Sequence, residues 1–206
     1  IYHCAQDGGL TFISLEALIG EDLVTALWGL SSRQQRRLFK EVKDALQRLH
    51  GVKAPPGALV GGLNARPLSA LLFERDIAPS LHSSAELHSY LRQLFISHNP
   101  SRAAEYDRDI APHLGAPSPL VLVHGDLHPG NILVHNGRLS GILDFGRAGW
   151  YPEWVEGWYA ALYMCTRGTV AHWGLLQQIT RGVTRKGRQW RWSMKADAGW
   201  MGAIDS

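Results

Sequence analysis

The chain has 206 residues, 45% of them apolar and 19% charged, which predicts one globular domain with a hydrophobic core. The net charge of +3 is small and the basic excess gathers near the C-terminus, so we expect no nucleic acid partner. No apolar run approaches the roughly 18 residues that span a membrane, and the two cysteines form no disulfide framework. We therefore expect no membrane partner and a reducing, cytoplasmic location.

The N-terminal part predicts a strand and then one long helix. Residues 10–15 have the composition of a strand. Ser32 and Gln35 fit a capping box at the start of the helix, and His50-Gly51 ends it before a Pro-Pro-Gly turn. The apolar face of this helix comprises Leu38, Val42, Ala45, Leu46 and Leu49.

The middle of the chain predicts an irregular surface segment over residues 51–82, followed by two helices. Ser83 and Ser84 begin one helix, and residues 102–110 form the other. The inner face of the first comprises Leu87, Leu91, Leu94 and Phe95. The histidines of this region lack metal-ligand spacing and are predicted to lie on the surface: His82, His88, His98 and His113.

Residues 120–143 carry the chemistry. The apolar runs 120–123, 132–134 and 142–143 are predicted strands, and a polar loop separates the first two. Asn131 follows Asp126 by five residues, and Asp144 follows it by eighteen. Carboxylate and amide oxygens suit Mg²⁺, and Asp126 is placed to accept a hydroxyl proton. This order predicts phosphoryl transfer, with Asp126 as base and Asn131 and Asp144 as metal ligands.

The residues of these motifs resemble those of a known protein family. His124-Gly125-Asp126-Leu127-His128-Pro129-Gly130-Asn131, with Gly where protein kinases usually have Arg, resembles the aminoglycoside phosphotransferase family. Gly149-Trp150-Tyr151-Pro152-Glu153 resembles the fungal-type branch of that family. The resemblance implies a kinase-like α/β (α+β) fold, a mainly helical C-terminal lobe whose short strands carry the catalytic loop, and transfer from ATP with Mg²⁺ to a small-molecule hydroxyl.

The resemblance also assigns roles outside the loop. It implies that His124 supports the loop backbone, and that Glu16, Ala17 and Leu18 form the hinge that binds the nucleotide base. The other interpretation of this segment is a strand that ends in a turn at Gly20. Of the remaining residues near the site, Phe145 is expected to pack inward and fix Asp144, Arg147 to be solvated, and Glu153 to be structural. Pro152 is expected in the first turn of a helix.

The chain shows neither a Gly-rich phosphate loop nor a lysine on a Val-Ala-Ile-type strand. We therefore expect most of the N-terminal lobe to be missing. The predicted domain spans residues 1–180, with a hinge remnant at 10–23 and the C-terminal lobe at 24–180, and residues 181–206 form an irregular basic tail. Activity of this chain is then expected to be weak or absent.

Two other functions are compatible with parts of the sequence. One is a non-catalytic kinase-like remnant that binds a partner or nothing. The other is a metal-dependent hydrolase built on His124, Asp126, His128 and nearby His135. The hydrolase interpretation leaves Asn131 and the Asp-Phe-Gly motif at Asp144 unexplained.

Overall fold

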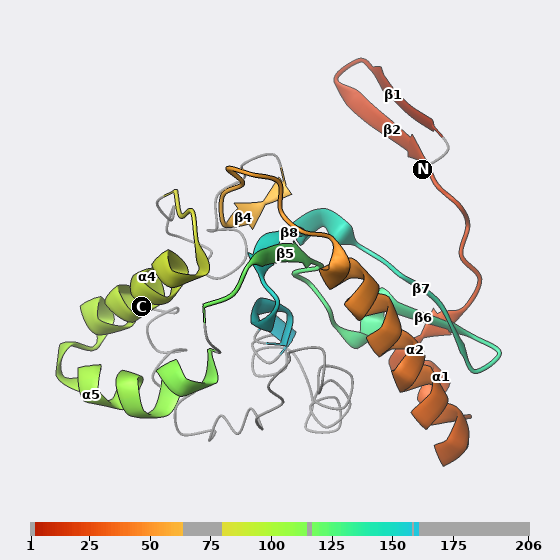
Figure 1. Ribbon diagram of the computed structural model, residues 1–206. Coiled ribbons are helices and arrows are strands. Elements are labelled where there is room, and N and C mark those ends of the chain that lie inside the picture. The colour runs from red at the N-terminus through yellow and green to blue at the C-terminus, as the bar shows by residue number, and fades with distance from the viewer. Residues whose placement is uncertain (1–2, 64–79, 115–116, 158, 161–206) are drawn as a thin grey trace.

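The computed structural model describes residues 3–63, 80–114, 117–157 and 159–160, which form helices and small antiparallel sheets (Figure 1). The sheets of this part of the chain are β1 (His3–Asp7) with β2 (Leu10–Ser14); β3 (Glu21–Asp22), β6 (Ile132–His135) and β7 (Arg138–Ile142); and β4 (Gly61–Gly62), β8 (Gly149–Pro152) and β5 (Leu120–Val123). The α-helices are α1 (Leu23–Leu27), α2 (Ser32–Gly51), α4 (Ser84–His98) and α5 (Ala103–Glu105).

Shorter helical turns connect these elements. They are η2 (Pro100–Arg102), the π-helical turn η3 (Tyr106–Ile110), η4 (Ala111–His113), η5 (Pro129–Asn131) and η6 (Phe145–Arg147). Residues 154–157 and 159–160 are helical as well. Within the described ranges, no helix has both the length and the apolar character required to cross a bilayer.

The predicted start of the long helix was wrong by one residue. Ser31, not Ser32, is the N-cap of α2, and Gln34 completes the capping box by accepting the Ser31 N–H at 3.0 Å. Both serines have Gln three positions later, so the sequence signal is ambiguous. Gln35 instead donates its side-chain amide to the carbonyls of Leu27 and Leu30, which closes the α1–α2 turn.

Other predictions were confirmed or corrected. The strands at 10–15, 120–123 and 132–134 appear as β2, β5 and β6, and the helix after Ser83 appears as α4. The helix predicted at 102–110 is divided into α5 and short turns. Pro152 does not begin a helix, because it pairs with Leu120 at the end of β8. The tail at 181–206 lies outside the described residues.

Two hydrophobic clusters hold the elements together, and the polar loop of residues 124–131 lies between them. One cluster joins α4, β5, β8 and the helical residues after β8, and Val123 belongs to it. The other joins α1, α2 and β6, and includes Leu127 and Ile132. The side chains of Val123, Leu127 and Ile132 are fully buried. The loop is therefore fixed at both ends and at its middle.

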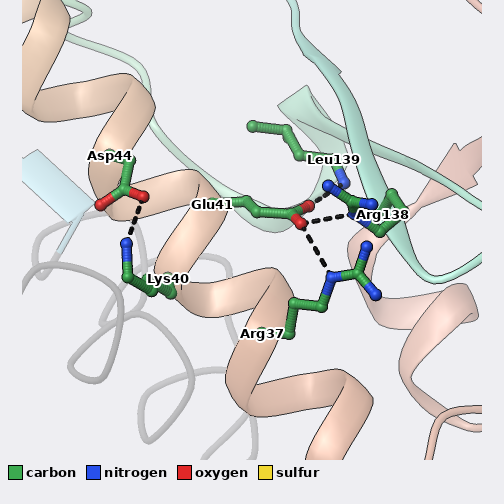
Figure 2. Close-up of polar contacts among 6 residues, drawn as sticks. All are labelled: Arg37, Lys40, Glu41, Asp44, Arg138 and Leu139. Carbon is green, nitrogen blue, oxygen red and sulfur yellow. Dashed lines mark hydrogen bonds and ion pairs between the residues drawn. The ribbon is translucent and has the colours of Figure 1, made fainter.

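Glu41 on α2 connects that helix to the β6–β7 hairpin (Figure 2). Its carboxylate accepts the Leu139 main-chain N–H at 2.9 Å and pairs with Arg138 at 2.5 Å and Arg37 at 3.3 Å. The hairpin begins just after Asn131 and ends just before Asp144, so this contact helps to place both ends of the proposed metal site.

The β1–β2 hairpin projects from the rest of the described chain (Figure 1). Several apolar side chains on and after β2 are exposed: Leu10, Phe12, Ile13, Leu15 and Ile19. A two-stranded hairpin alone buries too little apolar surface for independent stability.

Candidate active site

His124 anchors the start of the loop. Its side chain is fully buried, and its Nδ1 accepts the Asp126 main-chain N–H at 3.2 Å. Because Nδ1 accepts, the ring proton lies on Nε2, which donates to the Leu143 carbonyl at 2.7 Å. The His124 ring therefore connects Asp126, whose carboxylate is the proposed base, to Leu143, the residue before Asp144.

Asp126 lies at the turn of the loop, and its side chain is 17% exposed. Gly125, directly before it, has φ +76°, a left-handed conformation that glycine adopts without the steric cost of a Cβ. Asp126 can therefore face solvent while His124 and Leu127 on either side are fully buried. A carboxylate that is mostly buried but still reached by solvent, on a loop fixed by buried neighbours, is well suited to accept a proton from a substrate hydroxyl.

Asn131 is 8% exposed and connects the loop with the segment before Asp144. Its Nδ2 donates to the Asp126 carbonyl at 2.9 Å, and its own main-chain carbonyl accepts the Leu143 N–H at 2.8 Å. The amide oxygen Oδ1 is thereby oriented away from the Asp126 carbonyl and is the ligand atom that Asn131 offers.

Asp144 is exposed and has φ +59° and ψ +69°, an uncommon conformation for a residue with a Cβ. Its Oδ1 accepts the Gly146 N–H at 3.2 Å, which holds the carboxylate at the start of η6. The structure therefore brings Asp126, Asn131 and Asp144 into one bonded network through Leu143. Strained backbone of this kind is concentrated at functional sites.

The donor set fits Mg²⁺ held together with phosphates. One amide oxygen and one carboxylate are few protein ligands, and Mg²⁺ usually completes its shell with phosphate oxygens and water. In the described ranges no group of three or more His, Cys, Asp and Glu side chains could hold a metal. Both His124 nitrogens already have partners, which counts against the hydrolase interpretation built on His124, Asp126 and His128.

Arg147 was expected to be solvated, but its guanidinium also contacts Asp126 and Tyr159. Its Nε lies 3.7 Å from Asp126 Oδ2, its guanidinium lies 5.6 Å from the centre of the Tyr159 ring, and Nη1 donates to the Tyr159 hydroxyl. Its side chain is still 40% exposed. No local sequence signal points to this contact, because Asp126 and Tyr159 are brought to Arg147 only by the fold.

Phe145 does not pack wholly inward, since its side chain is 47% exposed. Its ring contacts the His124 imidazole edge-on, with centroids 4.6 Å apart. Phe145 was expected to fix Asp144, and it does so only indirectly: its ring contacts His124, which bonds Leu143.

His88 was predicted to lie on the surface. It is half-buried, and its ring packs against Trp154.

Glu156 is a second residue that sequence reasoning missed. It is 1% exposed, and its carboxylate accepts the main-chain N–H of His124 at 2.8 Å and of Gly125 at 3.3 Å. Glu153, which the sequence favoured as the structural carboxylate, is half-buried. The sequence signal that could have identified Glu156 is its position as an acidic residue within a mostly apolar stretch.

The predicted hinge residues are less closely joined to the site. Glu16 and Ala17 are exposed, while Leu18 packs against β7, where its Cδ1 would lie 2.4 Å from a Cβ added at Gly141. Gly20 has φ +147°, and a Cβ there would lie 2.6 Å from the Val134 carbonyl oxygen. The segment therefore runs across the β6–β7 hairpin that leads to Asp144.

These features define a protein of the kinase-like phosphotransferase class, with its carboxylates and amide at the ends of short strands. The chain belongs to the phosphotransferase enzyme family, whose family model matches residues 1–190. Membership of this family implies a protein-kinase-like fold. A search of curated proteins found no match to the chain.

Proposed function

We propose that this protein transfers the γ-phosphoryl group of ATP to a hydroxyl of a small molecule. The observation that supports this most strongly is the network in which Asn131 bonds the Asp126 carbonyl and the Leu143 N–H. It joins a proton acceptor and two oxygen ligands in one rigid unit. The sequence of residues 149–153, Gly-Trp-Tyr-Pro-Glu, further supports the fungal-type branch of the family.

Each residue then has a role that its environment permits. Asp126 accepts the proton of the substrate hydroxyl and orients its oxygen for in-line attack. Asn131 Oδ1 and the Asp144 carboxylate hold the cation. Mg²⁺, when bound, neutralises the phosphate charge that develops during transfer. The segment of Glu16, Ala17 and Leu18 supplies main-chain contacts to the nucleotide base.

A second candidate is a kinase-like module that binds nucleotide without transferring phosphate. The described lysines favour it, because none lies within a strand: Lys40 and Lys43 lie on α2, and Lys53 pairs with Val121 of β5 only as an isolated bridge. The Lys53 Nζ donates to the His50 carbonyl at 3.3 Å. A phosphate-clamping lysine contributes electrostatic stabilisation that positioning alone does not replace.

Phosphate transfer from γ-labelled ATP to a panel of hydroxyl compounds tests the proposal. Asp126→Asn should reduce transfer on the order of 10²–10⁴-fold. Asp44→Asn is the matched control, because Asp44 pairs with Lys40 on the outer face of α2, and its transfer rate should equal that of the wild type. Mg²⁺-dependent nucleotide binding with no transfer to any compound would favour the non-catalytic module instead.

A further inference from the structure

The outer face of α2 is strongly basic. This 20-residue helix carries six Lys and Arg residues but only two carboxylates, Glu41 and Asp44. Its apolar side chains are packed in the interior with α1 and β6, so the charged residues are left on the outside. The basic residues of the helix are Arg33, Arg36, Arg37, Lys40, Lys43 and Arg48.

Both carboxylates of the helix already have partners. Glu41 pairs with Arg37 and with Arg138 of β7, and Asp44 pairs with Lys40 at 2.6 Å (Figure 2). These ion pairs leave the cations accessible, because the side chains of Arg37, Lys40 and Arg138 are 54%, 74% and 55% exposed. Arg138 therefore adds a further positive charge beside the helix.

The remaining basic residues of α2 have no carboxylate partner in the described part of the chain. Arg33, Arg36 and Arg48 are exposed, and Lys43 is half-buried. An α-helix rises about 1.5 Å per residue, so the charges from Arg33 to Arg48 extend over about 22 Å. Charges spread in this way suit an extended anionic partner better than a single small anion. We call this set the α2 basic face: Arg33, Arg36, Arg37, Lys40, Lys43, Arg48 and Arg138.

Trp28 lies just before α2, at the end of α1, and is 89% exposed. The turn that carries it is held against the first turn of α2, because Gln35 donates to the carbonyls of Leu27 and Leu30 on either side of Trp28. Tryptophan is enriched at the boundary between water and lipid, where its amphipathic ring lies among the headgroups. An exposed indole at one end of a basic helix therefore favours a lipid surface.

Three kinds of extended anion can meet a basic face: an acidic protein, RNA and an anionic bilayer. Single-stranded RNA is usually held by several aromatic rings on which successive bases stack. In the described part of the chain, Trp28 is the only exposed aromatic residue next to α2 in sequence. An acidic protein would have to match cations scattered over the whole outer face. Lipid headgroups move laterally and gather under each cation, so the bilayer is the partner that these observations favour.

We propose that the α2 basic face, together with Trp28, binds the surface of an anionic phospholipid bilayer. The apolar side of α2 stays packed in the protein, so the helix adsorbs on the headgroups and does not insert. No membrane partner was expected from the sequence, because no apolar run could span a bilayer. Adsorption of a basic face requires no such run. The proposal does not depend on the phosphotransferase function.

Co-sedimentation of the full chain with lipid vesicles tests the proposal. The chain should bind vesicles of phosphatidylcholine with about one-third phosphatidylserine, and should not bind vesicles of phosphatidylcholine alone. Raising the salt concentration from about 0.1 M to about 1 M shortens the Debye length from about 10 Å to about 3 Å, and should release most of the bound protein. Equal binding to the two kinds of vesicle, or no binding to either, would overturn the proposal.

A pair of double variants locates the binding face. Arg33→Gln with Arg36→Gln should weaken binding to the anionic vesicles by about thirtyfold, because both cations lie on the α2 basic face. Arg92→Gln with Arg102→Gln is the matched control, since it removes the same charge from exposed ion pairs of α4 and η2. The control should bind nearly as the wild type does. Undiminished binding in the first variant, or an equal loss in both, would assign binding to another part of the chain or to net charge, and would overturn the proposal.

Trp28→Ser tests the face without a change of charge, and should weaken binding by about tenfold. Circular dichroism verifies that each variant is folded. If the Arg33 and Arg36 variant does not fold, the lipid selectivity of the wild type and the effect of Trp28→Ser still decide the proposal, and undiminished binding in Trp28→Ser would contradict it. Poly-L-glutamate and single-stranded RNA are the rival anions. Binding of either by a chain that ignores anionic vesicles would replace the bilayer with an acidic protein or an RNA as the partner.

Discussion

The side-chain amide of Asn131 donates to the main-chain carbonyl of Asp126 over 2.9 Å. This bond orients Asn131 so that its oxygen is left for a cation, and it fixes the loop whose carboxylate is the proposed base. Metal ligation and base placement therefore depend on the same buried amide. A change at Asn131 should consequently affect stability and nucleotide binding together.

Asn131→Asp tests this dependence with an almost isosteric change. The new carboxylate has no donor for the Asp126 carbonyl, so two acceptors face each other in a buried site. We expect a loss of about 1–3 kcal/mol in the free energy of unfolding, measured by urea denaturation. Equal stability of variant and wild type would show that the amide bond does not hold the loop.

Glu41 should contribute stability by fixing α2 to the β6–β7 hairpin (Figure 2). Glu41→Gln weakens the bond to the Leu139 N–H and should cost about 1 kcal/mol in the free energy of unfolding. The exposed partners Arg37 and Arg138 add little, since surface ion pairs contribute about 0–1 kcal/mol. Arg37→Gln is the control and should change stability by less than about 0.5 kcal/mol, and a larger loss there than in Glu41→Gln would contradict this account.

Arg147 should act on the rate through Asp126. Arg147→Lys keeps the charge but loses the planar group that stacks on Tyr159, so the cation is no longer held beside the carboxylate. We expect phosphate transfer to fall about tenfold, measured as kcat. Tyr159→Phe keeps the ring under the guanidinium and should retain more of the rate. Full activity of Arg147→Lys would argue against this role.

His88 should make stability depend on pH. Burial lowers the pKa of His88 below its usual value near 6.5, so the unfolded chain takes up a proton more readily than the folded chain. The stability contribution is therefore present above pH ~6.5 and is lost as the pH falls through the lowered folded pKa. His88→Phe keeps the ring beside Trp154 and should flatten the decline of the free energy of unfolding between pH 7 and 5. An unchanged slope would rule out His88 as its source.

Much of the site follows from local sequence. The apolar runs around the loop fix β5 and β6, and the spacing of Asp126, Asn131 and Asp144 places them at strand ends. What the sequence does not reveal is contact across distant segments. Glu156 and Arg147 acquire their partners only when the helical residues after β8 pack beside the loop.

Local ambiguity explains the remaining errors. Ser31 and Ser32 both precede a glutamine at the capping distance, and tertiary contacts of Gln35 with Leu27 and Leu30 decide between them. Pro152 is compatible with a helix start, but pairing with β5 makes it the last residue of β8.

Binding of Mg²⁺ and ADP to this chain, measured by calorimetry, tests the central claim most directly. We predict binding that requires Mg²⁺ and is lost in Asp144→Ala, while Asp44→Ala, altered on the outer face of α2, binds as the wild type does. Circular dichroism of each variant verifies that it is folded. A folded wild-type chain that binds no nucleotide, or binds it equally well without Asp144, would contradict the assignment of this site to phosphate transfer.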